Sequence, residues 1–309
     1  MLARVVTGAR SFSPLSSSRL WGVILSGRNV TTPGVPHESD HLGAPTSRRE
    51  SLPRRSGRIR SFRRAVDRAI RLIAPERVVA VLSREDSLAY EAELSSVPAV
   101  RRVLQPSYRG TAAEIFLPVM QIVRRDPDAV VVVLPGDQAV DLEARFMSYV
   151  AKAATATSLR PDVALLLAAP PSAPDGRRPW IEPGALVDGL EHLGVRYLDR
   201  FIQDPGQSDG RALFEGSGLE STGAIVATAR TLLALGRRYL PEVLETLEPL
   251  DDVLDAPEEP LLREAVWECM PYASLAEEIL ERGGDFGVLP VPDLCWRDRT
   301  RPEAELLAS

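Results

Sequence analysis

Two aspartates that each follow a short apolar run are the residues of this sequence best suited to hold a metal ion. Asp137 comes after the apolar run 129–134, in Pro-Gly-Asp-Gln, and Asp298 lies near the end of the sequence, in Trp-Arg-Asp-Arg. Carboxylate oxygens suit a hard cation such as Mg²⁺, which proteins often hold together with bound phosphates. Because an aspartate at the end of a strand is also a common turn residue, either position alone predicts little.

A second polar segment, 105–113, follows the apolar run 101–104 and reads Gln-Pro-Ser-Tyr-Arg-Gly-Thr-Ala-Ala. Arg109 would offer a planar fork of donors to an anion, and Thr111 would cap a helix whose N-terminus faces that anion. The same residues also suit a helix that is merely capped. The segment alone therefore leaves both interpretations open.

The segment from His37 to His41 matches the string H-E-x-x-H of zinc proteases, which requires both imidazoles on one face of a helix. Prolines and glycines on both sides of the motif exclude a helix of useful length. The only other histidine is His192. We therefore expect His37 and His41 in an exposed irregular loop and not in a zinc site.

Strands and helices alternate along the chain, and this alternation determines how the candidate residues are positioned. A run such as 129–134, with no polar alternation, is typical of a central strand that is covered on both faces. Apolar residues at helical spacing predict amphipathic helices between the strands. We expect strands at 21–26, 77–82, 101–104, 129–134, 162–168, 195–202, 224–228 and 286–291, and helices at 58–73, 85–94, 111–125 and 142–155.

This order predicts an α/β fold with a doubly wound sheet. Residues 29–57 have no periodicity and predict a long loop. In open α/β sheets the ligand crevice lies at the carboxyl ends of the strands. The positions that end the candidate strands at this crevice are Ser26, Leu104, Leu134, Ile202 and Val291.

The composition narrows the class of protein. The chain of 309 residues has a formal net charge of −6, which argues against a nucleic-acid-binding surface because such a surface needs an excess of basic residues. Two cysteines are too few for a disulfide framework, and no apolar run has the length of a transmembrane helix. We expect a soluble, cytoplasmic protein.

The N-terminal residues are rich in Arg and Ser and lack acidic residues, as organellar transit peptides do. Arginine is preferred over lysine throughout the chain, however, with Lys152 as the only lysine. This favours disordered tails, which we expect at 1–20 and 303–309, around a single domain at 21–302.

In the order of its segments the sequence resembles the bacterial mannose-1-phosphate guanylyltransferases, a family of sugar-phosphate nucleotidyltransferases. The resemblance runs from Trp21 to about Pro302. Five segments match in the same order along the chain, which is more specific than a match of any single segment. The matching segments are 21–27 (opening strand and signature loop), 105–112 (base recognition), 126–137 (metal-carboxylate strand), 180–184 (sugar-binding glutamate) and 295–298 (final metal-binding aspartate).

The resemblance implies a Rossmann-like nucleotidyltransferase domain with a mixed, mostly parallel sheet and no extra C-terminal β domain. It implies transfer of GMP from GTP to mannose-1-phosphate, giving GDP-mannose and pyrophosphate, with Mg²⁺ as the cofactor and a homodimer as a possible assembly. Nucleic acids and membranes are not expected partners. The implied site residues are Asp137 and Asp298 (catalysis and metal), Leu25, Ser26, Gly27, Gln105, Arg109, Gly110 and Thr111 (nucleotide), and Glu182 and Thr222 (sugar).

Several positions depart from the family pattern. The family's signature loop is rich in glycine and ends in arginine, whereas this chain has Arg28, Val30 and Thr32 at the corresponding positions. The family's later lysine aligns with Thr46, and Asp204 replaces a lysine near the sugar. Such losses weaken phosphate binding unless nearby arginines compensate. They keep open a second hypothesis, a catalytically impaired paralogue that binds a nucleotide sugar or a partner.

Overall fold

The computed structural model describes residues 19–26, 52–176, 178–254, 256–282, 286–294 and 296–298, of which 52–55, 139 and 296–298 are described by their backbone alone. Gly27, the motif from His37 to His41 and most of the two expected tails lie outside these residues. The first strand starts at Leu20, one residue inside the tail expected at 1–20.

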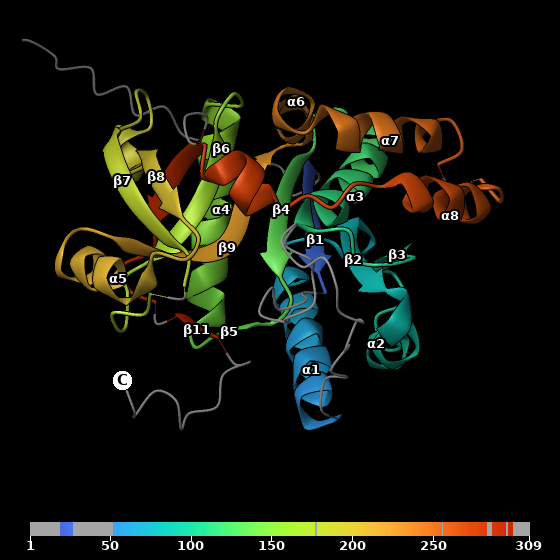
Figure 1. Ribbon diagram of the computed structural model, residues 1–309, viewed down its shortest axis with the longest axis horizontal. Coiled ribbons are helices and arrows are strands. Elements are labelled where there is room, and N and C mark those ends of the chain that lie inside the picture. Colours follow the sequence, from blue (N-terminus) through green and yellow to red (C-terminus); the bar gives the residue numbers. More distant parts are fainter. Residues whose placement is uncertain are drawn as a thin grey trace, which may run out of the picture.

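A nine-stranded mixed sheet forms the centre of the protein, in the order β3-β2-β1-β4-β9-β6-β10-β8-β7 (Figure 1). Strands β8 and β9 run antiparallel to their neighbours, and the others run in one direction. The predicted mixed, mostly parallel sheet is therefore confirmed. The strands are β1 (Leu20–Leu25), β2 (Val78–Ser83), β3 (Arg101–Gln105), β4 (Val130–Pro135), β6 (Ala164–Ala169), β7 (Trp180–Leu186), β8 (Arg196–Ile202), β9 (Leu219–Thr228) and β10 (Phe286–Pro290).

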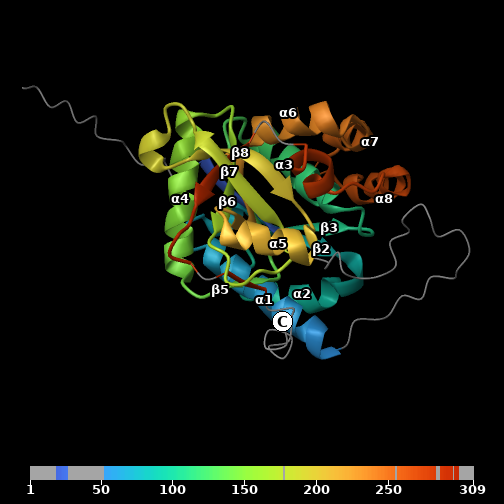
Figure 2. The ribbon, with the colours of Figure 1, turned by 60° about the vertical axis from the view of Figure 1, so that its left-hand side comes forward.

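Helices cover both faces of this sheet, because strands such as β4 carry apolar side chains on both faces. Val131 and Val133 belong to one core and Val130 and Val132 to the other, because successive side chains of a strand point to opposite faces. One core is covered by α1, α2 and α4, and the other by α3, α6, α7 and α8 (Figure 2). The helices are α1 (Leu52–Ala69), α2 (Ser87–Leu94), α3 (Thr111–Arg125), α4 (Glu143–Leu159), α5 (Gly206–Glu215), α6 (Ala229–Tyr239), α7 (Pro241–Asp251) and α8 (Glu259–Cys269).

The start of α1 differs from the prediction. The helix begins at Leu52, so the part of the expected loop from 52 to 57 is wrong. Pro53 lies in the first turn, where proline costs no hydrogen bond within the helix. The helix ends at Ala69, four residues before the expected end, and Pro75 then disfavours a helical conformation at Ala74.

Strand β7 was missed because its sequence has no strand-like alternation. Its middle contains Pro183 and Gly184, and its pairing with β8 shifts register on both sides of Pro183. Proline lacks a backbone N–H and is tolerated in a sheet at such irregularities. In the described part of the chain, no helix is long and apolar enough to cross a membrane.

Candidate functional site

Among the described residues, five of the ten buried polar side-chain atoms that have no hydrogen-bond partner lie at or just after the ends of strands. Leaving a buried donor or acceptor unpaired costs about 1–3 kcal/mol, so a folded protein normally avoids it. Each of these atoms is out of contact with solvent, so a ligand at this edge of the sheet would pair with one only after its side chain turns outward. They are Ser83 Oγ at the end of β2, Gln105 Nε2 at the end of β3, Arg109 Nε, Gln138 Oε1 after β4 and Gln203 Oε1 after β8.

The predicted metal carboxylates come from segments that meet at this edge. Asp137 follows β4 after Gly136 and directly precedes β5 (Gln138–Val140), which pairs antiparallel with β11 (Trp296–Asp298) (Figure 1). In this pairing the backbone of Asp298 lies opposite Gln138, the neighbour of Asp137. The juxtaposition expected from the sequence is therefore present, while the binding of a metal by these residues stays a prediction.

Two oxygen donors of this kind fit Mg²⁺, which commonly takes one or two carboxylates and completes its shell with phosphate and water oxygens. Among the described side chains, no group of three or more His, Cys, Asp or Glu forms a denser metal site elsewhere. Asp137 and Asp298 as ligands of a metal ion stay a prediction.

The turn that carries Asp137 is held against the end of β1. The backbone N–H of Gly136 donates to the carbonyl of Leu25 at 2.8 Å. A Cβ atom at position 136 would lie 2.5 Å from both that carbonyl oxygen and the Phe62 ring, so a residue larger than glycine does not fit. The end of β1, where Leu25 and Ser26 are expected to bind nucleotide, and the turn before Asp137 thus form one unit.

Segment 105–111 begins α3 differently from the prediction. Gly110, with φ of +86°, is the N-cap of α3, and no side chain caps this helix. The prediction that Thr111 caps it is wrong, because the Thr111 hydroxyl accepts from the backbone N–H of Leu275 at 2.9 Å. The N–H of Ala112 donates to the carbonyl of Ala273, so protein covers the start of α3 where an anion was expected.

A segment about 160 residues later in the chain holds the backbone of the same loop. Arg263 donates to the Leu104 carbonyl at 2.8 Å, and Trp267 Nε1 donates to the Ser107 carbonyl at 2.7 Å. The backbone of residue 273 completes the contact by donating to the Arg109 carbonyl, at 3.1 Å. No local pattern in the sequence signals these contacts. They fix the backbone of segment 105–111 while the Arg109 side chain keeps a buried Nε without a partner.

The end of β1 is also held from α2. The Tyr90 hydroxyl donates to the Ser26 carbonyl at 3.2 Å and accepts from Arg58, which is paired with Asp86 at 2.7 Å. Burial raises the pKa of the Tyr90 phenol well above its ordinary value; Arg58 opposes this rise, and the charges of Asp86 and Asp137 add to it. The phenol is therefore protonated and acts as a donor over the physiological range.

Sheet pairing brings the end of β8 to the end of β6. Ile202 lies beside Trp180, Trp180 beside Glu220, and Glu220 beside Ala169, the last residue of β6. From the sequence, β8 is expected to be a parallel strand that ends at the crevice. This direction is wrong, because β8 runs antiparallel to β10. The hairpin of β7 and β8 nevertheless folds its end toward this edge.

The two residues expected to bind sugar lie on these strands. Glu182 on β7 is paired with Arg200 at 2.9 Å, and its side chain is half-buried. Thr222 on β9 is fully buried, with its hydroxyl donating to the Leu167 carbonyl at 2.7 Å and accepting from the N–H of Ala224. The hydroxyl of Thr222 is therefore used within the fold, whereas Glu182 keeps an accessible carboxylate.

A buried ion pair that the sequence did not predict lies beside them. Arg178 donates to Glu220 at 2.7 Å and also lies 3.5 Å from Asp175. Burial raises the pKa of the Glu220 carboxyl, although the charge of Arg178 opposes the rise. The part of the sheet where β7 meets β9 therefore carries a polar, partly neutralised cluster.

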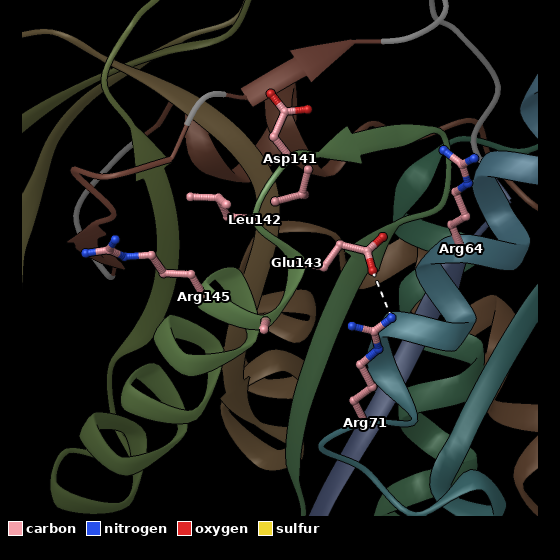
Figure 3. Close-up of a pocket in the computed structure, with 8 residues that line it drawn as sticks. Arg64, Arg71, Asp141, Leu142, Glu143 and Arg145 are labelled. Carbon is pink, nitrogen blue, oxygen red and sulfur yellow. Dashed lines mark ion pairs between the residues drawn. The ribbon is translucent and has the colours of Figure 1, made fainter.

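A cavity of about 600 Å³ lies on the α1 and α4 side of β5 (Figure 3). It is lined by arginines, but two of them are neutralised: Arg71 is paired with Glu143 at 3.3 Å, and Arg145 is paired with Asp293. Little positive charge is left there for a triphosphate. We therefore place the site at the edge that carries the unpaired polar atoms and not in this cavity.

Solved structures share this arrangement of strands and helices. The protein described as mannose-1-phosphate geranyltransferase from Thermus thermophilus has a TM-score of 0.71 at 18% identity, over 94% of this chain and 80% of its own. The chain therefore shares the fold of this protein. The protein described as mannose-6-phosphate isomerase from Helicobacter pylori has a TM-score of 0.61 at 14% identity, over 77% of this chain and 90% of its own. No family model and no curated protein matches the sequence.

Proposed function

We propose that the chain is a Mg²⁺-dependent nucleotidyltransferase that acts on a sugar 1-phosphate, with GTP and mannose-1-phosphate as its substrates. The observation that supports this most is the β5–β11 pair, which brings the backbone of Asp298 next to that of Asp137 at the edge with unpaired polar atoms. The fold and the sequence resemblance agree with it, and the name printed for the Thermus structure also refers to mannose-1-phosphate.

In the proposed reaction an oxygen of the sugar phosphate attacks the α-phosphorus of GTP. A new P–O bond forms, the bond to the β-phosphate oxygen breaks, and its electron pair leaves with pyrophosphate. Bound Mg²⁺ would neutralise charge on the phosphate oxygens. Asp137 and Asp298 would hold this ion, and Arg109 would donate to the nucleotide with the Nε that has no partner inside the protein. Segment 105–111 would position the base.

The acceptor sugar would lie against β7 and β8. Glu182 has a half-buried carboxylate there that could accept from sugar hydroxyls. Gln203 follows β8 with an unpaired Oε1, and its backbone N–H is held by Glu281 at 3.0 Å. These two groups are acceptors, which suit the hydroxyls of a sugar and leave its phosphate to the metal.

Pyrophosphate release with GTP, Mg²⁺ and mannose-1-phosphate tests the proposal. We expect release that needs all three components and falls at least about 100-fold in Asp137→Asn, the upper end for residues that only support metal ligands. Asp162→Asn is the matched control, because Asp162 pairs with Arg160 just before β6, at the opposite edge of the sheet. A protein that neither releases pyrophosphate nor binds any of the common nucleoside triphosphates would contradict the proposal.

A second candidate is a non-catalytic protein that binds a nucleotide or nucleotide sugar. The covered start of α3 favours it, since Ala273 takes the N–H that an anion would use. The altered signature loop favours it as well. Tight binding of GTP or GDP-mannose together with no pyrophosphate release would support this candidate over the first.

A further inference from the structure

Three polar side chains from different elements form a buried cluster at the end of β1. Arg58 comes from α1, Asp86 from the turn before α2, and Tyr90 from α2. Tyr90 is fully buried, and the Arg58 guanidinium lies 2.6 Å from its hydroxyl and 2.7 Å from the Asp86 carboxylate. Burying two charges and a phenol together is costly unless all are well paired. The cluster therefore has a defined geometry, and the proposed chemistry does not use it directly.

The cluster fixes the backbone where β1 ends. The Tyr90 hydroxyl donates to the Ser26 carbonyl, and the preceding carbonyl, that of Leu25, accepts from Gly136. Both carbonyls are therefore held, one from α2 and one from the turn before Asp137. The backbone that leaves β1 at this point is the segment expected to wrap the phosphates, and it lacks most of the family's glycines.

One aromatic ring connects the cluster to the turn that carries Asp137. Phe62 packs edge-to-face against Tyr90 with ring centroids 4.7 Å apart. The same ring lies directly under Gly136, where a Cβ atom would come within 2.5 Å of it. A movement of the Tyr90 ring would therefore be transmitted to the turn before Asp137.

We propose that Tyr90 is a positioning residue for the triphosphate and its metal ion. Its hydroxyl holds the end of β1, and Arg58 and Asp86 fix the direction in which that hydroxyl points. The backbone at Leu25 and Ser26 and the turn that carries Asp137 thereby keep one common geometry. This inference rests on the proposed function, because it concerns the same nucleotide site.

Tyr90→Phe tests the proposal, since it removes the hydroxyl and keeps the ring against Phe62. We expect the affinity for GTP with Mg²⁺, measured by calorimetry, to fall about tenfold, which is the factor that corresponds to one net hydrogen bond. The affinity for guanosine should stay unchanged, because the base-recognition segment 105–111 is held separately by residues 263–275. Tyr149→Phe is the matched control, as it removes from α4 a tyrosine hydroxyl that contacts Asp293 and not the end of β1.

A Tyr90→Phe protein that binds GTP as tightly as the wild type would overturn the proposal. So would an equal loss of GTP and guanosine binding, which indicates a general structural defect. If Tyr90→Phe does not fold, Asp86→Asn keeps the ring and the hydroxyl but removes the ion pair with Arg58, and it should weaken GTP and spare guanosine in the same way. A wild-type protein that neither releases pyrophosphate nor binds any of the common nucleoside triphosphates would refute the proposed function and this inference with it.

Discussion

Replacing Gly110 by alanine should destabilise the protein strongly because two separate costs add. Gly110 has φ of +86° and ψ of 167°, a region that is essentially restricted to glycine and costs another residue about 1–3 kcal/mol. The added Cβ would also lie 2.1 Å from the Ala273 carbonyl oxygen, so the backbone at Ala273 must move. That movement breaks its hydrogen bonds with Arg109 and Ala112, each worth about 0.5–1.5 kcal/mol.

The total is about 2–6 kcal/mol, which is a large part of the free energy of unfolding of a typical domain, about 5–15 kcal/mol. Urea unfolding followed by circular dichroism measures the change. Gly189→Ala is the matched control, because Gly189 has φ of +83° with no atom within 4 Å of the added Cβ, so only the conformational cost applies. Equal destabilisation by the two variants would refute the conclusion that residue 273 holds the start of α3.

Three other predictions concern the site and its supports. Trp267→Phe should lower the free energy of unfolding by about 1 kcal/mol in urea unfolding, because the Ser107 carbonyl loses its donor. Burial holds the pKa of the Glu220 carboxyl above its ordinary value, so Glu220 stays protonated to a higher pH in the folded state than in the unfolded chain. The contribution of Glu220 to stability should therefore fall as the pH rises above about 4.3, the ordinary pKa of a glutamate. Urea unfolding at several pH values should show a flatter dependence in Glu220→Gln. The family's loop is restored by Arg28→Gly, Val30→Gly, Thr32→Arg and Thr46→Lys. This variant should raise the rate of pyrophosphate release by about 10³-fold, the factor for one cationic clamp. An unchanged rate in a folded variant would place the defect among the residues expected to bind the sugar.

The parts of the fold that local sequence controls were predictable. The run of β4 is apolar at every position because both faces of that strand are covered, and its length and place follow from this alone. The meeting of the Asp137 and Asp298 segments was also predictable, because the order of segments along the chain resembles that of a family. Composition and spacing alone gave no means to place β11 beside β5.

The parts that depend on distant contacts were not predictable. Thr111 looks like a helix cap, and only the structure shows that its hydroxyl is taken by Leu275. Trp267 and Ser107 are separated by 160 residues, and no periodicity connects them. Strand β7 contains Pro183 and Gly184, which locally oppose a strand, and the pairing with β8 and β9 overrides that preference.

Binding of Mn²⁺ in place of Mg²⁺ tests the central claim most directly, because Mn²⁺ is detected by electron paramagnetic resonance. Titrated with GTP present, the wild-type protein and the Asp162→Asn control should each bind one Mn²⁺ per chain. Asp137→Asn and Asp298→Asn should each weaken this binding by at least about 100-fold. Mn²⁺ binding that is the same in all four proteins would contradict a metal site between the end of β4 and β11.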